Sequence, residues 1–272
     1  MTRLFQRSVR LIAGDLLVDN LRVQFRVKKT LSKEPNECEA VLYNLSESSR
    51  SRLQAKGARL ILEAGYGAER AQIFSGDARQ IDHVHDGANW LTKLQCGDGE
   101  RAYRYERVNE SFRAGTSRSA VFRRLAEATG LDIREALVTA AERLTDQFTQ
   151  GYAALGRVSS ELDRVLKGTG LEWSIQDGRL QALPEGGVTK DAAVALSADT
   201  GLIGSPAYGT PQTTRGRRTL RLKSLLQSAL RPGGKVRLVS DTAKGDFRVL
   251  EVVHAGDTHG ADFYSEVEAV PL

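Results

Sequence analysis

The sequence predicts a mainly β protein with an α+β insertion, in which two β-barrels flank a small helix–strand middle domain. Three observations favour this class. Gly is frequent, at 26 of 272 residues, which suits a chain with many tight turns. Polar and apolar residues alternate through residues 1–103 and again through 188–272, as they do in half-buried strands. Between these segments, residues 104–187 change to helical spacing with capping residues.

The first segment is predicted to contain a series of strands and one helix. A hairpin pattern covers "RSVRLIAG" and "LRVQFRVKKT", which alternate on either side of a turn at Asp15. A third strand follows in "ECEAVLYNL". One short helix is expected in "SESSRSRLQAKG", where serines precede the helix and Gly57 stops it. Further strands with glycine turns occur in "ARLILEAGYG", "AQIFSGDARQIDHVHDG" and "NWLTKLQCGDG". The pattern indicates a compact β-barrel or sandwich that carries one helix.

The middle segment is predicted to hold two similar helix–strand units. In "GTSRSAVFRRLAEATGLDI", Thr116 or Ser117 is the expected N-cap of a helix that ends at Gly130. In "GRVSSELDRVLKGTGLEWSI", Ser159 is the expected cap and Gly170 the stop. Each helix is followed by a predicted strand, so this segment has an α+β composition.

A hairpin across Asp177-Gly178 is predicted to close the middle segment, because Asp-Gly between alternating runs is a strong hairpin signal. From Val188 the β pattern returns in "AAVALSADTG", "SPAYG" and "RRTLRLKSLL". The run "PGGKVRLVS" opens on a turn, and "GDFRVLEVVHAG" and "ADFYSEVEAV" complete the pattern. Residues 188–272 are therefore predicted to form a second β-barrel.

The two β segments share one short match, between "QIDHVHDGANWLTKLQC" and "VHAGDTHGADFYSEVEA". In each, a histidine precedes Gly-Ala, an Asn or Asp, an aromatic residue and an alternating strand. The match aligns His85, Gly87, Ala88, Asn89 and Trp90 with His259, Gly260, Ala261, Asp262 and Phe263. A duplicated barrel is the simplest account of this pattern.

Four chemically active side chains gather near the end of the chain, within nine residues: His254, Asp257, His259 and Asp262. A metal site needs ligands that converge. Asp257-Thr258-His259-Gly260 also has the residue types of a turn, because Asp bonds its own backbone and Gly accepts positive φ. The turn interpretation explains every residue, whereas the metal interpretation explains four.

His83 and His85 are two residues apart and share one face of a predicted strand, with Asp82 and Asp86 beside them. This is a geometry for two metal ligands, but a polar face near a turn is the more frequent use of such residues. A site that combines these two histidines with His254 and His259 would require the two barrels to meet face to face. We therefore assign no catalytic, cofactor-binding or metal-binding residue from the sequence.

The composition and charge favour no enzyme class and no specific nucleic-acid binder. The net charge of +5 is mild for this length. The basic run Arg215–Lys223 has no interleaved aromatic residues for stacking on bases, so a loop or a protected edge strand is expected. This run and Arg231–Arg237 are candidates to face acidic partners. Cys38 and Cys96 lie in alternating apolar stretches and are expected to be buried free thiols.

Known targeting and catalytic motifs are not found in the sequence. The N-terminus lacks the apolar run of a signal peptide, and no stretch is long and apolar enough to span a membrane, so assembly in the cytoplasm is expected. The run "GYGAERAQIFSG" lacks the GK[ST] end of a phosphate loop, and GxSxG, HExxH and kinase motifs are missing. We expect no enzymatic activity and no cofactor.

In the order of its elements the chain resembles the baseplate hub proteins of contractile-tailed phages and of tailocins. It is also similar in plan to the base of type VI secretion spike proteins. The resemblance covers nearly the whole chain and includes "GLEWSIQDGRLQALPEGG", "LSADTGLIGSPAYGT", "LLQSALRPGGKVRL" and "GDFRVLEVVHAGDTHGADFYSEVEAV". Its most specific parts are the Asp199–Pro206 loop, the Leu230–Lys235 turn and the final "HAGDTHGADFY" hairpin.

The resemblance implies a structural protein of the virion tail baseplate, assembled in the host cytoplasm. Each chain would supply two tube-type barrels, so that a homotrimer forms a pseudo-sixfold ring between the sixfold tail tube and the threefold central spike. The tail tube protein and the spike protein are the implied partners, with the tape-measure protein and other baseplate proteins as further candidates. Two alternatives stay open: a metal-dependent hydrolase that uses the histidine pairs, and a basic nucleic-acid-binding module.

Overall fold

The computed structural model describes residues 6–55, 59–209 and 218–272. Gly57, the predicted helix stop, and residues 215–217 of the first basic run lie outside these ranges. The described chain groups into two compact units. The first contains Met1–Leu31, Asn36–Gly97 and Val188–Leu272, and the second contains Ser32–Pro35 and Asp98–Gly187.

The first unit is built almost entirely of strands. Its N-terminal elements are β1 (Arg7–Ala13), β2 (Leu16–Val18), β3 (Val23–Thr30), β4 (Glu37–Tyr43), α1 (Glu47–Ala55), β5 (Arg59–Tyr66), β6 (Glu69–Asp86) and β7 (Asn89–Gly97). Its C-terminal elements are β14 (Val194–Leu196), the 3-10 helix η1 (Ala198–Thr200), β15 (Leu202–Tyr208), β16 (Leu220–Leu225), β17 (Lys235–Val239), β18 (Lys244–Asp257) and β19 (Phe263–Pro271). The alternating burial along most of these strands is the pattern that the sequence predicts.

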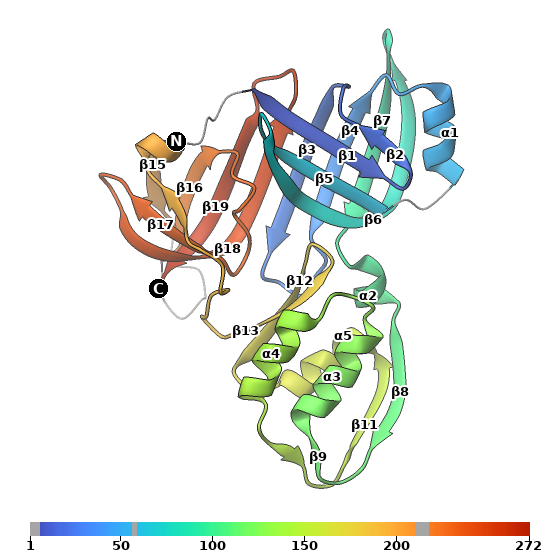
Figure 1. Cartoon of the computed structure of the whole chain (residues 1–272), viewed down its shortest axis with the longest axis vertical. Helices are drawn as coiled ribbons and strands as arrows, with labels where there is room; N and C mark the ends of the chain where they lie inside the picture. The colour runs from blue at the N-terminus through green and yellow to red at the C-terminus, as the bar shows by residue number, and fades with distance from the viewer. Residues whose placement is uncertain (1–5, 56–58, 210–217) are drawn as a thin grey trace. The chain divides into compact units, whose positions relative to one another are not determined.

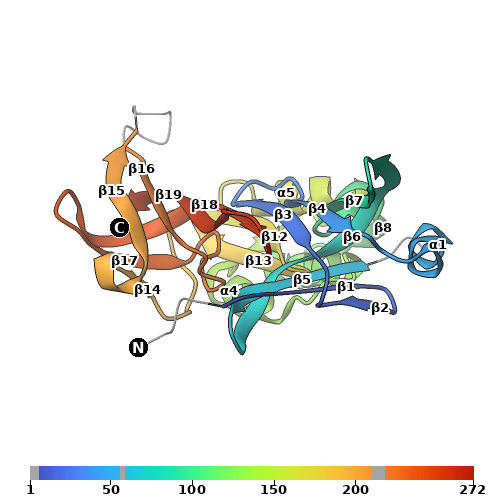
Figure 2. The same ribbon diagram turned by 90° about the horizontal axis from the view of Figure 1, so that it is seen from above.

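Within the described residues these strands form one hydrogen-bonded sheet. Its order is β15-β16-β19-β18-β3-β4-β7-β6-β5-β1-β2, with β17 paired to β18 and β14 paired to β17. In Figures 1 and 2 the blue and cyan strands of the first segment therefore continue into the orange and red strands of the last. The mainly β class with an α+β insertion is confirmed, while closure of the strands into two barrels stays a prediction.

The sheet contains the same five-strand arrangement twice. In the N-terminal set, β3, β4, β7, β6 and β5 are neighbours in that order, and all four pairs are antiparallel. In the C-terminal set, β15, β16, β19, β18 and β17 are neighbours in that order, again with four antiparallel pairs. The two sets also follow the same order along the sequence, so they have one topology, which a duplicated segment would produce.

Each five-strand set has its own apolar core. The N-terminal core includes Leu11, Val27, Leu42, Leu62 and Phe74, none of them measurably exposed. The C-terminal core is a separate cluster. Its most buried members are Leu196, Leu220, Val236, Leu238, Val252 and Ala269. The N-terminal core also includes Leu226 and Phe263 from the C-terminal segment, so the two sets share apolar packing where they meet.

Cys38 and Cys96 are buried free thiols, as the sequence predicts. They lie directly opposite each other on β4 and β7. Burial raises the pKa of Cys96 to about 12, so its thiol stays protonated and unreactive at neutral pH.

The second unit holds the predicted α+β insertion. Its elements are α2 (Glu100–Arg104), β8 (Arg107–Phe112), β9 (Thr116–Ser117), α3 (Arg118–Ala128), α4 (Arg134–Arg143), β10 (Gln147–Phe148), β11 (Tyr152–Arg157), α5 (Val158–Leu166), β12 (Leu171–Gln176) and β13 (Arg179–Pro184). α3 and α5 pack around a core that includes Phe122, Leu125, Leu162 and Trp173. Among the described residues, no helix is long and apolar enough to cross a bilayer.

The helix boundaries of this unit follow the sequence in part. Ser117 caps α3 as predicted, since its side chain accepts a hydrogen bond from Ala120 N. Ser159 does not cap α5; Arg157 occupies that position, and the Ser159 hydroxyl, inside the first turn, donates to Tyr103 O at 2.9 Å. The Asp177-Gly178 turn is confirmed, with both residues at positive φ between β12 and β13.

Candidate functional site

The two five-strand sets meet along a single strand pair, β3 with the second half of β18. The ladder is antiparallel and pairs Glu251 with Thr30, His254 with Val27 and Asp257 with Gln24. The first part of β18 instead pairs with β17. β18 therefore belongs to one set at its start and joins the other set at its end, so that this junction is the central feature of the sheet.

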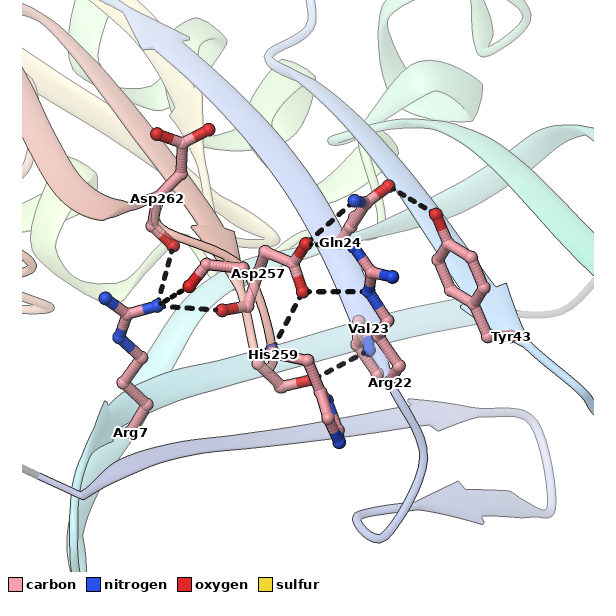
Figure 3. Close-up of polar contacts among 10 residues, drawn as sticks. Arg7, Arg22, Val23, Gln24, Tyr43, Asp257, His259 and Asp262 are labelled. Carbon is pink, nitrogen blue, oxygen red and sulfur yellow. Dashed lines mark hydrogen bonds and ion pairs between the residues drawn. The ribbon is translucent and has the colours of Figure 1, made fainter.

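Asp257 is the polar centre of the junction (Figure 3). Its carboxylate accepts hydrogen bonds from Arg22 Nη2 at 2.7 Å and Gln24 Nε2 at 2.8 Å, and from the His259 backbone N–H at 2.9 Å. Tyr43 Oη in turn contacts Gln24 Oε1 at 2.9 Å. Burial raises the pKa of Asp257, but these hydrogen bonds outweigh it and hold the net pKa far below the ordinary value. The carboxylate is therefore charged, and hydrogen bonds within the fold already occupy both of its oxygens.

The loop from Thr258 to Asp262 is fixed from two sides. Thr258 exchanges hydrogen bonds with Val23, through the Thr258 N–H and the Thr258 hydroxyl. The guanidinium of Arg7, from β1, donates to the backbone carbonyls of Asp257, Gly260 and Ala261. Figure 3 shows its contacts with Asp257 and Asp262. These contacts confirm the turn interpretation for Asp257-Thr258-His259-Gly260, extended by two residues.

The predicted ligand residues do not converge. His259 is exposed in the loop, where its Nδ1 contacts the Thr258 hydroxyl, whereas His254 is buried inside β18. His85 packs its ring against Trp90, with ring centroids 4.9 Å apart. No group of three or more His, Cys, Asp or Glu side chains suited to a metal ion is found among the residues that the structure describes.

His83 and His254 occupy equivalent positions in the two five-strand sets. Nδ1 of His83 lies 3.0 Å from the hydroxyl of Thr92, its cross-strand partner on β7. Nδ1 of His254 lies 2.8 Å from the hydroxyl of Ser265, its cross-strand partner on β19. The same His–hydroxyl pair thus recurs in both sets, which strengthens the case for a duplicated segment.

The sequence match missed this equivalence because it aligned His85 with His259. The structure places His85 in β6 opposite Trp90, whereas His259 lies in the loop after β18. The alignment of Asn89 and Trp90 with Asp262 and Phe263 agrees with the register of the return strands. A two-residue turn in one set and a five-residue loop in the other shift the histidines relative to each other.

The buried imidazole of His254 makes the fold sensitive to acid. Burial lowers the pKa of His254 to about 3, from an ordinary value of 6.5, and the charge of Lys29 adds to this effect. Because the folded pKa is depressed, the stabilising contribution is complete above the unfolded value and is lost as pH falls below it. We expect a loss of about 2 kcal/mol of unfolding free energy between about pH 7 and about pH 5.

Denaturant unfolding at a series of pH values measures this effect. His254→Asn keeps a polar group near Ser265 but cannot take up a proton, so its stability should vary less over the same pH interval. His85→Asn, at an exposed position, is the matched control and should retain the parent's slope. An unchanged slope in His254→Asn would show that another group causes the acid sensitivity.

Arg221, Lys223 and Arg237 of the basic runs are paired with acidic residues of neighbouring strands. Lys223 lies 3.4 Å from Glu266 across the β16–β19 ladder. Arg237 contacts Asp246 at 2.9 Å across the β17–β18 ladder. Such pairs reduce the positive field that a nucleic-acid backbone would meet. The expected edge strand is not found in the described residues, because β16 lies between β15 and β19 and β17 lies between β14 and β18.

Comparison with known proteins places this fold among tail proteins. No family model matches the sequence, and no curated protein matches it. The tail protein from Neisseria meningitidis MC58 superimposes with a TM-score of 0.66 at 10% identity, covering 98% of this chain and 97% of that one. The 43 kDa tail protein of prophage MuSo2 from Shewanella oneidensis gives 0.67 at 9% identity, with the same coverage of 98% and 97%.

A secretion protein has the same fold. The E. coli c3393 protein, a component of the type VI secretion system with structural similarity to the T4 bacteriophage tail proteins gp27 and gp5, gives a TM-score of 0.60 at 10% identity. The match covers 96% of this chain and 76% of that one. At the level of the fold, these matches confirm the resemblance to hub and spike-base proteins that the sequence indicates.

Proposed function

We propose that this protein is a structural hub of a contractile phage tail or a tail-like injection machine. Three copies would form a pseudo-sixfold ring between the tail tube and the central spike, located in the tail baseplate. The single observation that carries the proposal is the duplicated five-strand set inside one chain whose whole length has a tail-protein fold.

The duplication matters because of symmetry. A ring of three chains that each present two similar surfaces offers six similar surfaces to a sixfold partner. The same ring keeps true threefold symmetry for a trimeric partner on its other side. A chain with a single five-strand set would need six copies to do this and would then mismatch the trimer.

We further propose that the role is not enzymatic. The residues that the sequence offered for metal chemistry are used within the fold: His83 and His254 in cross-strand pairs, and Asp257 in the junction. The solved relatives are described as tail proteins and as a secretion-system component. The residues 104–187 would then decorate the outside of the ring and contact neighbouring baseplate proteins.

Mass in solution tests the proposal. Sedimentation or light scattering over a range of concentrations is expected to give three times the mass of the chain, and rings are expected in negative-stain electron micrographs. Zinc analysis of the same sample distinguishes the hydrolase alternative, which requires stoichiometric metal. A protein that stays monomeric at every concentration, or that holds one zinc per chain, would contradict the hub.

A further inference from the structure

We infer how neighbouring copies join: β15 of one copy pairs antiparallel with residues 80–86 of β6 in the next copy, and so repeats between chains the β3–β18 junction within the chain. The inference rests on the proposed function, because it requires a second copy of this chain. It goes further by naming the two strands, their direction and their register.

The strand equivalence follows from the shared topology. β3 and β15 are the first strands of their sets, and β6 and β18 are the fourth. Inside the chain, the first strand of the N-terminal set pairs with the fourth strand of the C-terminal set. Among the described residues, the first strand of the C-terminal set does not pair with the fourth strand of the N-terminal set. A second copy can supply this pairing.

Two β-bulges fix the residue equivalence between β6 and β18. The β6–β7 ladder skips Arg79, and the β18–β19 ladder skips Leu250. Arg79 precedes Asp86 by the same number of residues as Leu250 precedes Asp257, and these two aspartates end their strands. This alignment places His83 on His254, in agreement with their matching hydroxyl partners.

Residues 80–86 of β6 have an open edge. In the part of the chain that the structure describes, β6 pairs with β5 through Glu69–Asp77, and the later residues of β6 pair with β7. The equivalent half of β18 is buried at almost every position because β3 covers it, whereas 80–86 are exposed or half-buried. Val84 is 40% exposed and the adjacent Trp90 38%. The second half of β18 thus has a strand on both sides, whereas the equivalent half of β6 has a strand on one side.

β15 is the second strand with an open edge. It ends the sheet order beyond β16 (Figure 1), whereas its equivalent β3 has neighbours on both sides. Pairing with β16 opposes Tyr208 to Leu220, as pairing with β4 opposes Val27 to Cys38. Tyr208 therefore corresponds to Val27. Val27 is fully buried beneath β18, but Tyr208 is 50% exposed.

The backbone of Tyr208 is directed toward the open edge. Gly209 N–H donates to Thr219 O, so residues 207 and 209 turn their hydrogen-bonding groups toward β16. Because direction alternates along a strand, the N–H and C=O of Tyr208 point away from β16. A long edge strand with exposed apolar side chains is a template for pairing with another chain. Ile203, on the same strand, is 40% exposed.

The register follows from the internal junction. His254 opposite Val27 becomes His83 opposite Tyr208 of the neighbouring copy, and Ala255 opposite Arg26 becomes Val84 opposite Ala207. Pro206 lies two residues before Tyr208, as Phe25 lies two residues before Val27, and His85 stands where β18 has Gly256. Pro206 has no N–H, and its carbonyl already accepts a hydrogen bond from the Thr242 hydroxyl at 3.2 Å. The backbone pairing between copies is therefore centred on Tyr208 and His83.

Cysteine cross-linking tests this register. In the Val84→Cys, Ala207→Cys double variant, the two cysteines form a directly opposed pair without backbone hydrogen bonds, where Cα atoms lie about 4.5 Å apart and a disulfide fits. Mild oxidation is expected to give covalent trimers that a reducing agent dissolves. Each single variant, and Asp82→Cys with Ala207→Cys, shifted by two residues, should give at least about tenfold less.

The outcomes separate this inference from the proposed function. Trimers in solution that do not cross-link at Val84 and Ala207 would overturn the strand pairing and leave the hub intact. Absence of trimers together with absence of cross-links would overturn both. Cross-linking of the shifted pair as efficiently as the predicted pair would show that the register is wrong.

A backbone variant gives a second readout that does not depend on cysteine. Tyr208→Pro removes an outward N–H and should abolish trimers while leaving the melting temperature of the monomer nearly unchanged. Ala207→Pro removes an N–H directed at β16 and should lower that temperature instead. If Tyr208→Pro still forms trimers with the parent's affinity, β15 does not provide the interface.

Discussion

Asp257→Asn is expected to lower the free energy of unfolding by about 2 kcal/mol or more, although only one oxygen is replaced. Both carboxylate oxygens of Asp257 accept from donors: Oδ1 from Arg22 Nε and the His259 N–H, and Oδ2 from Arg22 and Gln24. An amide would place its own NH2 against one set of donors. Because the Arg22 side chain is 39% exposed, water relieves part of this cost.

The matched control is Asp86→Asn, at the equivalent end of β6, where the side chain is exposed. We expect a change within about 0.5 kcal/mol there. Chemical denaturation of both variants at neutral pH gives the comparison. The low folded pKa of Asp257 adds a pH signature: its contribution is complete above the ordinary carboxyl value and disappears only in strong acid. A parent-like Asp257→Asn would mean that the junction does not depend on this charge.

Gly256→Ala is expected to cost about 2 kcal/mol through overpacking at the same junction. A Cβ at Gly256 would lie 2.4 Å from Phe25 Cζ and 3.0 Å from Phe263 Cδ2. Both rings are buried and pack edge to face, with centroids 6.1 Å apart. β18 is held by β3 and β19 on its two sides, so the backbone cannot move away from the rings.

A variant at Phe25 tests whether the clash with its ring causes the loss of stability. If the clash is responsible, Gly256→Ala combined with Phe25→Leu should lose less stability than the two single variants together. The control is His85→Ala, at the equivalent position of β6. Because His85 already has a Cβ and its side chain is exposed, this change should leave the stability nearly unchanged. Thermal or denaturant unfolding measures all four variants. Strict additivity of the double variant would contradict the steric explanation.

Local patterns in the sequence predict much of this fold because they act over short distances. The alternation in "LRVQFRVKKT" corresponds to β3, whose odd-numbered residues Val23, Phe25 and Val27 are buried. The Asp-Gly pair at 177–178 fixes its hairpin because both residues reach positive φ. Ser117 was identifiable as a cap since its hydroxyl bonds within one helical turn.

The remaining features depend on contacts that no local pattern encodes. Helix α4 was not predicted, because Ile133 at its N-cap makes no side-chain hydrogen bond that would mark its start. Ser159 looked like a cap, but its hydroxyl finds a partner in Tyr103, far away in the sequence. The β3–β18 ladder joins residues more than 200 positions apart, and Arg7 and Arg22 gain their roles only through it. The junction at Asp257 was therefore visible in the sequence only as a turn.

The distance along the sequence between β3 and β18 has a consequence during synthesis. β3 leaves the ribosome more than 200 residues before its partner in Lys244–Asp257. Until then one flank of β3 is bare, and closing so long a loop is slow. The nascent strands β1–β7 should therefore engage a holding chaperone until β18 is made, which would also delay premature association with sister chains.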